Sequence, residues 1–277
     1  MKNDECIICN TKTMPYFNKE RYNIPNAEEL TRELVPVEFH RCPCCGFVIS
    51  KTHQNLTAAQ WGEINSDFHH DNENNDRKNL GFNQPPFVEQ AFMIELLARN
   101  NLIDDSAILD YASGYGRLSH ILKKYYGREI KCYDKYIKSL EQHYIDDLKA
   151  GSWSLVINSA MFEHILTRRD LDAVNELIAH SGALFVHTVI VEEVPQDPNW
   201  FYLDIPVHTA VHTNKSMSLL MEQWGFNSSI YSPKSKSWVL LRQNYEDIKP
   251  IVESINRELQ TSWLWGKQGF MDYWKTC

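Results

Sequence analysis

Two groups of residues in this chain have types and spacings that could do chemistry, and the first is a glycine-containing turn. An apolar run over residues 107–109 ends at Asp110, and glycines follow at positions 114 and 116. The amphipathic stretch 118–126 then predicts a helix. A strand, a glycine turn and a helix in this order bring backbone N–H groups and a helix N-terminus up to a nucleotide-like ligand. The segment therefore predicts a ligand site.

The residues around this turn separate several classes of nucleotide site. A P-loop would end in Gly-Lys-Ser/Thr, which this turn lacks, and a dinucleotide fingerprint needs a third glycine where this chain has Ser119. The charge of Asp110 would repel a pyrophosphate and suits a cationic ligand without phosphates. Asp134 ends the next strand-like run, residues 129–133, where a carboxylate can accept two hydrogen bonds from ribose hydroxyls. The alternative is a purely structural strand-to-helix turn.

The second group consists of four cysteines in two Cys-x2-Cys pairs. Cys6 and Cys9 form one pair, and Cys42 and Cys45 form the other after 32 intervening residues. In each pair one turn can point two thiolates at one metal ion, and Gly46 is a residue that a tight turn after the second pair would favour. Four thiolates suit tetrahedral zinc and leave no open coordination position. The pattern predicts a structural zinc site.

Other interpretations of the cysteines remain open. Cys44 is a spare thiol that could compete for a place at the metal. The thiols could also be buried and free, or could hold an iron–sulfur cluster. Residues 33–41 and 47–50 have the pattern of strands that enter and leave the second pair.

Length, charge and composition limit the classes of function. A chain of 277 residues with 43% hydrophobic residues accommodates one full α/β domain and a small module. A net charge of −8 argues against nonspecific binding to nucleic acid or to anionic membranes. No apolar run reaches the length of a membrane span, and the N-terminus has no signal-peptide core. We therefore expect a cytoplasmic protein, in which cysteines serve as metal ligands or buried thiols.

The glycine turn resembles the first motif of the class I S-adenosylmethionine-dependent methyltransferases. That motif is an acid followed by alternating glycines, and a second acid closes the next strand; Ala112 stands here in place of the first glycine. The resemblance implies an α/β fold with a Rossmann-like seven-stranded sheet and helices on both faces, beside the small N-terminal zinc-binding module. It implies S-adenosylmethionine as cofactor, and we expect it to be held by Asp110, Ser113, Gly114, Gly116, Asp134, Asp146 and Asn158.

The periodicity of apolar residues and the positions of turn-forming residues predict an order of helices and strands. We divide the chain into a zinc-binding module (1–55), a helical bridge and lid (56–100), the S-adenosylmethionine-binding domain (101–243), and a C-terminal helix with an aromatic tail (244–277). Polar residues 67–76 predict a loop. Residues 144–148 fall where the family's third strand ends. Further helices are expected at 83–100, with proline in the first turn, and at 171–179, and further strands at 153–158, 183–190, 227–231 and 237–241.

Four residues are candidates for acid–base catalysis. Glu163 and His164 follow the expected strand 153–158, while His208 lies near the end of the expected loop 192–211 and His212 directly follows it. Histidine titrates near neutral pH and a neighbouring carboxylate can orient it. In the sugar C-methyltransferases a Tyr-x-Glu-His stretch at this point takes part in catalysis, and Met161 replaces the tyrosine here. A structural or pocket-lining role for His164 is the alternative.

The N-terminal cysteines add a second resemblance, to methyltransferases of sugars in which a zinc-binding segment precedes the catalytic domain. It implies a small-molecule acceptor, a carbohydrate, and favours O-methylation with His164, His208, His212 or Asp204 as base. Aromatic residues in the loop 192–211 suit such an acceptor. Sugar C-methylation and a non-catalytic binding protein with the same fold are the alternatives. We expect no nucleic-acid partner, and a homodimer is the assembly to test.

Overall fold

The computed structural model of the chain describes residues 4–22, 32–74, 84–137 and 144–272. Two β-sheets organise these residues, a larger one of seven strands and a smaller one of five. In the described part of the chain, every helix is too short or too polar to cross a membrane.

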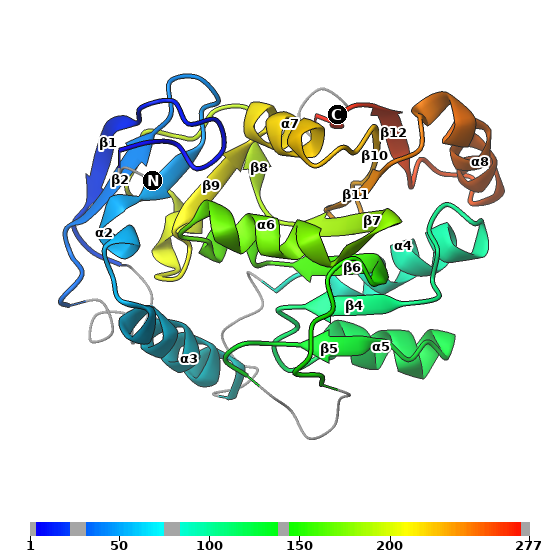
Figure 1. Cartoon of the computed structure of the whole chain (residues 1–277), viewed down its shortest axis with the longest axis horizontal. Helices are drawn as coiled ribbons and strands as arrows, with labels where there is room; N and C mark the ends of the chain where they lie inside the picture. Colours follow the sequence, from blue (N-terminus) through cyan, green and yellow to red (C-terminus); the bar gives the residue numbers. More distant parts are fainter. Residues whose placement is uncertain (1–3, 23–31, 75–83, 138–143, 273–277) are drawn as a thin grey trace.

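The larger sheet has the strand order β12-β10-β11-β7-β6-β4-β5 (Figure 1). The four strands β5, β4, β6 and β7 run parallel, and β11 pairs with β7 in the opposite direction. The carboxyl ends of the four parallel strands therefore lie along the same side of the sheet, which we call its carboxyl edge. The strand bounds are β4 Ile108–Tyr111, β5 Lys131–Tyr133, β6 Trp153–Ser159, β7 Ile178–His187, β10 Ser228–Ser232, β11 Ser237–Leu241 and β12 Trp265–Gln268.

Helices cover both faces of this sheet. Alternate residues of a strand point to opposite faces, so Ile108 and Leu155 pack with one set of helices while Leu109 and Val156 pack with the other. The first set is α4 (Phe87–Arg99), α5 (Arg117–Tyr126) and α8 (Tyr245–Glu258), and the second is α6 (Arg168–Leu177) and α7 (Asn214–Gln223). The predicted Rossmann-like α/β fold of the class I methyltransferases, with seven strands and two helical layers, is confirmed.

Both edges of the sheet differ from expectation. The expected third strand at residues 144–148 is reduced to a single bridge between Cys132 and Tyr144. The seventh strand is instead β12, which lies in the segment expected to be a helix and tail and pairs antiparallel with β10. Aromatic packing gives a reason, because the ring of Trp238 stacks on Phe270 just beyond β12 at a centroid distance of 5.6 Å.

The smaller sheet joins the N-terminal segment to a much later part of the chain. Its order is β1-β2-β3-β9-β8, and it lies to the left of the larger sheet in Figure 1. The expected strands around the second cysteine pair are present as β2 and β3, whereas β1 is not evident from the sequence pattern. The bounds are β1 Met14–Lys19, β2 Val37–Arg41, β3 Val48–Ser50, β8 Ile190–Val191 and β9 Ala210–Thr213. The proposed division of the chain at residue 55 stays a prediction.

The polar run expected to be a loop is mostly helical. After the short helix α2 (Lys51–Gln54), α3 extends over Ala58–Asn74 and so includes residues 67–74, while 75 and 76 lie outside the described residues. Trp61, Ile64 and Phe68 recur at helical spacing and pack against the core of the smaller sheet. Once such a stripe has nucleated a helix, extension into polar residues costs little. The prediction of a loop was wrong for this reason.

Candidate functional site

The glycine turn, Asp134 and the Glu163–His164 pair lie at the carboxyl ends of neighbouring strands of the larger sheet. The turn follows β4, Asp134 follows β5, and the short 3-10 helix η1 (Phe162–His164) follows β6. Open α/β sheets bind ligands beyond the carboxyl ends of their strands. Two left-handed alanines, Ala112 (φ 61°) and Ala160 (φ 65°), also lie just after strands at this edge. Such strained backbone is concentrated at functional sites.

Three left-handed residues shape the turn after β4. Ala112, Gly114 (φ 54°) and Gly116 (φ 71°) alternate with Ser113 and Tyr115. Gly116 is the N-cap of α5, so the turn leads directly into the positive end of a helix. The backbone N–H of Ser113 donates to the carbonyl of Tyr133 on β5, at 3.1 Å. The turn is thus held against the neighbouring strand.

Asp134 anchors this turn from the next strand. Its Oδ2 accepts a hydrogen bond from the Gly114 N–H at 2.9 Å, and its Oδ1 accepts from the N–H groups of Tyr136 and Ile137 at 2.8 and 2.9 Å. Asp134, which we predict to bind the ribose of the cofactor, therefore also positions the backbone of the turn. Each carboxylate oxygen has two lone pairs, so Oδ2 retains acceptor capacity for a ligand hydroxyl.

Asp110, the acid that precedes the turn, is buried with 2% of its surface exposed. Burial raises its pKa to about 7, and the charge of Asp134 adds to that rise. A carboxylate held in this environment is stabilised by a cation, because a nearby positive charge favours the ionised form. A cationic ligand therefore fits Asp110 better than an anionic one.

Unpaired amide groups lie at the end of β6. Both polar side-chain atoms of Asn158 are buried without a hydrogen-bond partner, as is Nε2 of Gln90. The other amide atom of Gln90, Oε1, accepts a hydrogen bond from Ser159 Oγ at 3.0 Å. Buried polar groups usually have partners, so unpaired ones here indicate polar atoms supplied by a ligand. With Asp110 and Asp134, they fit a cofactor that combines a positive charge with hydroxyl and amino groups.

The segment that contains Asp146, an expected cofactor ligand, has a neighbouring residue with a clear structural role. Asp146 is exposed, and its place as a cofactor ligand stays a prediction. Two residues earlier, the hydroxyl of Tyr144 donates to the carbonyl of Gly114. This tyrosine supports the turn, but its type and position gave no signal of that in the sequence.

Three of the four predicted catalytic residues come together. One ligand-type atom each from Glu163, His164 and His208 lies within 4.8 Å of the others. The imidazole rings of the two histidines have centroids 5.4 Å apart. Thr209 brings the two segments together, since its N–H donates to the Glu163 carbonyl at 2.8 Å and its hydroxyl to the Ile165 carbonyl, also at 2.8 Å.

Burial sets the electrostatics of this cluster. Glu163 is 4% exposed, and burial raises its pKa to about 7 against hydrogen bonds from Thr188 and Tyr202 that lower it. Burial also raises the pKa of Tyr202 well above its ordinary value. The backbone carbonyl of Tyr202 accepts a hydrogen bond from His208 Nδ1 at 2.7 Å, which places the lone pair of the neutral ring on Nε2.

His212, the fourth candidate, lies elsewhere. It is fully buried between the rings of Phe47 and Phe162, at centroid distances of 4.9 and 5.6 Å. Its Nε2 contacts the carbonyl of Phe162 at 3.2 Å, and burial lowers its pKa to about 4. The structure therefore places His212 in the apolar core between the two sheets and does not bring it into the cluster.

The segment before His208 carries aromatic and charged residues toward the cluster. The ring of Tyr202, in the 3-10 helix η2 (Phe201–Asp204), packs on His208 at a centroid distance of 4.3 Å, while Phe201 is 62% exposed. Asp204 pairs with the buried Lys19 of β1 at 2.9 Å. Lys19 was missed by the sequence pattern because a lysine in a polar N-terminal stretch is usually solvated.

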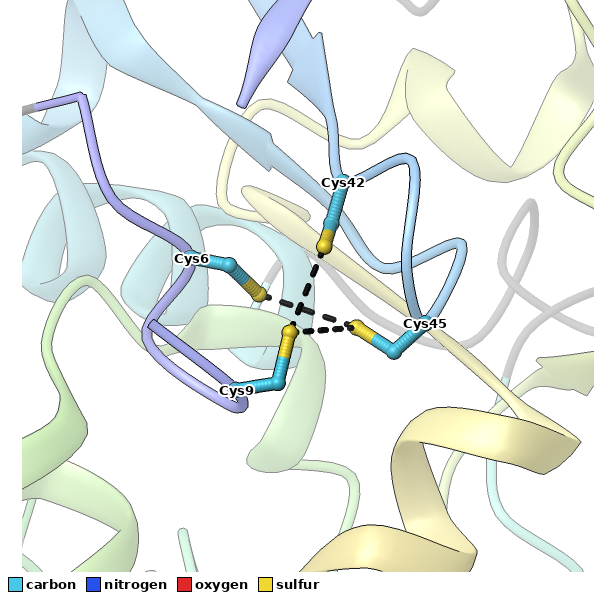
Figure 2. A group of neighbouring side chains, drawn as sticks. All are labelled: Cys6, Cys9, Cys42 and Cys45. Atoms are coloured by element: carbon cyan, nitrogen blue, oxygen red, sulfur yellow. Dashed lines mark hydrogen bonds between the residues drawn. The ribbon is translucent and has the colours of Figure 1, made fainter. Parts of the chain in front are cut away.

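The four predicted zinc ligands converge from two loops (Figure 2). The sulfur atoms of Cys9 and Cys42 are 3.4 Å apart, those of Cys6 and Cys45 3.6 Å, and those of Cys9 and Cys45 3.8 Å. Sulfur atoms bound to tetrahedral zinc would lie roughly 3.8 Å apart. The cluster could therefore hold a four-coordinate metal ion, while Cys44 is exposed and outside it.

Each cysteine pair is followed by a left-handed residue, Asn10 (φ 59°) or Gly46 (φ 74°). A side chain at Gly46 would be tight as well as strained, since a Cβ there would lie 3.1 Å from Thr213 Cγ2. The Thr213 hydroxyl donates to the Cys45 carbonyl at 2.5 Å, and Gln223 Nε2 donates to the Ile8 carbonyl at 3.0 Å. These contacts fix the cysteine loops to β9 and α7 of the main body.

Comparisons with known proteins find similarity to solved structures but none to a family model or a curated protein. A methyltransferase from Thermotoga maritima, described as a possible histamine N-methyltransferase, has 13% identity and a TM-score of 0.44 over 66% of this chain and 100% of its own. The plantazolicin methyltransferase BamL, solved with S-adenosylhomocysteine and a desmethylplantazolicin analogue, has 9% identity and a TM-score of 0.43 over 69% and 96%.

A methyltransferase from Aquifex aeolicus has 13% identity and a TM-score of 0.36 over 57% of this chain and 92% of its own. Because these TM-scores are low, we assign the fold from the strand order of this chain and not from its similarity to the solved structures. The assignment depends on three features: four parallel strands, the antiparallel strand β11 beside β7, and helices on both faces of the sheet. The chain has the fold of the class I S-adenosylmethionine-dependent methyltransferases, with an added N-terminal four-cysteine module.

Proposed function

We propose that this protein transfers a methyl group from S-adenosylmethionine to a hydroxyl of a small molecule, a sugar or a sugar-linked metabolite. One observation carries the proposal: a turn held by Asp134 and a cluster of Glu163, His164 and His208 share the carboxyl edge of one sheet. The cofactor would supply an activated methyl group. Asp110, Asp134, Asn158 and the backbone of the turn would hold it.

The histidines support a hydroxyl acceptor. A hydroxyl has a pKa far above 7, so its methylation needs a base, and an imidazole can serve near neutral pH. His164 is partly exposed, whereas Glu163 and His208 are buried beside it, so His164 is the member of the cluster that an acceptor can reach. The carbonyl of Tyr202 orients the ring of His208, and the buried carboxyl group of Glu163 lies within 4.8 Å of a nitrogen atom of each ring.

An aromatic surface beside the cluster supports a carbohydrate acceptor. Phe201 is exposed, its ring lies 6.0 Å from that of Trp200, and the next residue, Tyr202, packs on His208. Exposed aromatic rings bind sugars through stacking and C–H contacts. C-methylation is the second candidate, favoured by the adjacent Glu163–His164 pair, although Met161 replaces the tyrosine that the sugar C-methyltransferases have.

We also propose that Cys6, Cys9, Cys42 and Cys45 bind one structural zinc ion. The sulfur distances support this, as does the absence of any open position once four thiolates bind. The zinc would stabilise the two loops that β9 and α7 hold, and it would take no part in the reaction.

Calorimetry with S-adenosylmethionine and S-adenosylhomocysteine tests the cofactor, with ATP and NAD as negative controls. Transfer of a labelled methyl group to a panel of free and nucleotide-linked sugars tests the acceptor. We expect both cofactor forms to bind and His164→Ala to retain binding while losing transfer. Absence of cofactor binding at millimolar concentration would refute the enzyme assignment. Binding without turnover of any hydroxyl-bearing acceptor would favour the non-catalytic alternative.

A further inference from the structure

The buried cluster at the carboxyl edge has a feature that a simple acid–base pair does not explain. One carboxylate oxygen of Glu163, Oε2, is buried and has no hydrogen-bond partner among the described residues. An ionised oxygen without a partner is costly in an apolar setting. Two imidazoles with nitrogen atoms within 4.8 Å of this carboxyl group accompany it. Two histidines and one carboxylate are a common ligand set for divalent first-row metals.

The geometry of the two rings matches joint ligation. Two imidazoles bound to one metal at a tetrahedral angle have ring centroids roughly 5.3 Å apart, given metal–nitrogen distances of about 2.1 Å. The centroids of His164 and His208 are 5.4 Å apart, and their planes are inclined by 41°. Backbone hydrogen bonds of Thr209 fix this spacing, because they tie the strand that follows His208 to the carbonyls of Glu163 and Ile165.

The surroundings also match those of metal ligands. His208 donates Nδ1–H to the Tyr202 carbonyl at 2.7 Å, which is the usual arrangement for a histidine that binds metal through Nε2. The hydroxyls of Thr188 and Tyr202 lie close enough to the Glu163 carboxyl group to lower its pKa, and they are 3.4 Å from each other. His164 is the one member of the cluster with part of its surface exposed.

We propose that Glu163, His164 and His208 bind a divalent first-row transition metal, in a site separate from the four cysteines. Three protein ligands leave at least one coordination position for a water molecule or a substrate oxygen. If the proposed O-methylation is correct, a metal there would bind the acceptor hydroxyl and lower its pKa. The metal site itself does not depend on that reaction.

Cobalt(II) titration of the full chain separates the two sites by their spectra. Cobalt bound to the cysteines gives intense thiolate charge-transfer absorption, whereas cobalt bound by histidine and carboxylate gives only weak visible bands. We expect two equivalents to bind, one with each signature. Glu163→Gln and His208→Ala should weaken binding of the second equivalent by more than about 100-fold, beyond the loss seen when residues that only orient a metal ligand are changed. They should leave the thiolate bands unchanged.

The exposed His180→Asn variant serves as the control, and circular dichroism confirms that each variant is folded. Glu163→Gln preserves side-chain volume, so it keeps the test valid if His208→Ala fails to fold. Binding of one equivalent only, with thiolate bands, would overturn the proposal. So would a second equivalent that survives Glu163→Gln. Neither result depends on methyl transfer, so failure of the metal site and failure of the proposed reaction are distinguishable.

Discussion

The carboxylate of Asp134 accepts a hydrogen bond from the backbone N–H of Gly114 at 2.9 Å, and so joins the end of β5 to the turn after β4. We expect Asp134→Ala to weaken S-adenosylhomocysteine binding by roughly 1–3 kcal/mol, since it removes ribose hydrogen bonds and loosens the turn. Calorimetry measures the change, and Glu129→Ala, an exposed acid near the start of the same strand, should have no effect. Unchanged affinity in Asp134→Ala would refute the ribose assignment.

Asp110 makes apo-protein stability depend on pH. Its folded pKa is about 7 and its ordinary value is 3.8, so the folded state holds the proton more tightly. Stability from this group is therefore present below about pH 4 and is lost as pH rises toward 7. Asp110→Asn should match the wild type near pH 4 and be more stable at pH 8 by up to about 4 kcal/mol. Urea unfolding at both pH values measures this, and an equal difference at both would contradict it.

Ala112 adopts a left-handed conformation with φ of 61°, which costs a residue with a Cβ about 1–2 kcal/mol. Ala112→Gly relieves that strain but adds entropy to the unfolded chain, so the net gain in the free energy of unfolding should be up to about 1 kcal/mol. Ala98→Gly, in the right-handed helix α4, should instead lose about 1 kcal/mol. Thermal melts of both variants test whether Ala112→Gly stabilises the protein while Ala98→Gly destabilises it.

Cys9→Ser removes one of the four sulfur ligands, and we expect it to abolish tight binding of the cysteine-bound metal and to destabilise the protein by several kcal/mol. Cys44→Ser is a close control, because Cys44 is exposed and only one residue before the ligand Cys45. Elemental analysis should find the cysteine-bound zinc in the wild type and in Cys44→Ser. Full retention of zinc and stability in Cys9→Ser would count against the site.

Lys19 is 1% exposed, and its ammonium group pairs with Asp204 at 2.9 Å and donates to the Pro198 carbonyl at 2.7 Å. Lys19→Met removes the ammonium group from its buried pair with Asp204, so we expect a loss of about 2–4 kcal/mol in the free energy of unfolding. Glu193→Gln disrupts only the exposed pair with Arg41 and should cost less than about 1 kcal/mol. Similar losses of unfolding free energy in both variants would show that the buried Lys19–Asp204 pair stabilises the protein no more than the exposed Arg41–Glu193 pair.

The parts of the fold that could be predicted from sequence are those set by local patterns. The apolar run before Asp110 and the helical stripe of α4 each identified an element of the larger sheet or its layers, and the spacing of Cys6, Cys9, Cys42 and Cys45 identified their cluster. Long-range pairing could not be predicted. The strand β12 depends on β10 as a partner and on packing of Phe270 against Trp238, and nothing in residues 265–268 alone indicates a strand.

The same limit applies to the candidate site. Glu163 and His164 are adjacent in sequence, but their proximity to His208 depends on the hydrogen bonds of Thr209 across 46 residues. His212 has the same residue type and lies only four positions further on, yet its ring enters the core between Phe47 and Phe162. Residue type predicted candidates, and only the packing separated one histidine from the other.

The shared sheet has a consequence for how the chain folds. Strand β3 pairs with β9, whose residues follow it by more than 150 positions, and the Cys45 loop bonds to Thr213 at the end of β9. During synthesis the cysteine segment emerges long before its partner strand exists. Such non-local pairing slows folding. The N-terminal segment therefore lacks its partner strand until β9 has been synthesised, after strands β4 to β7 of the larger sheet.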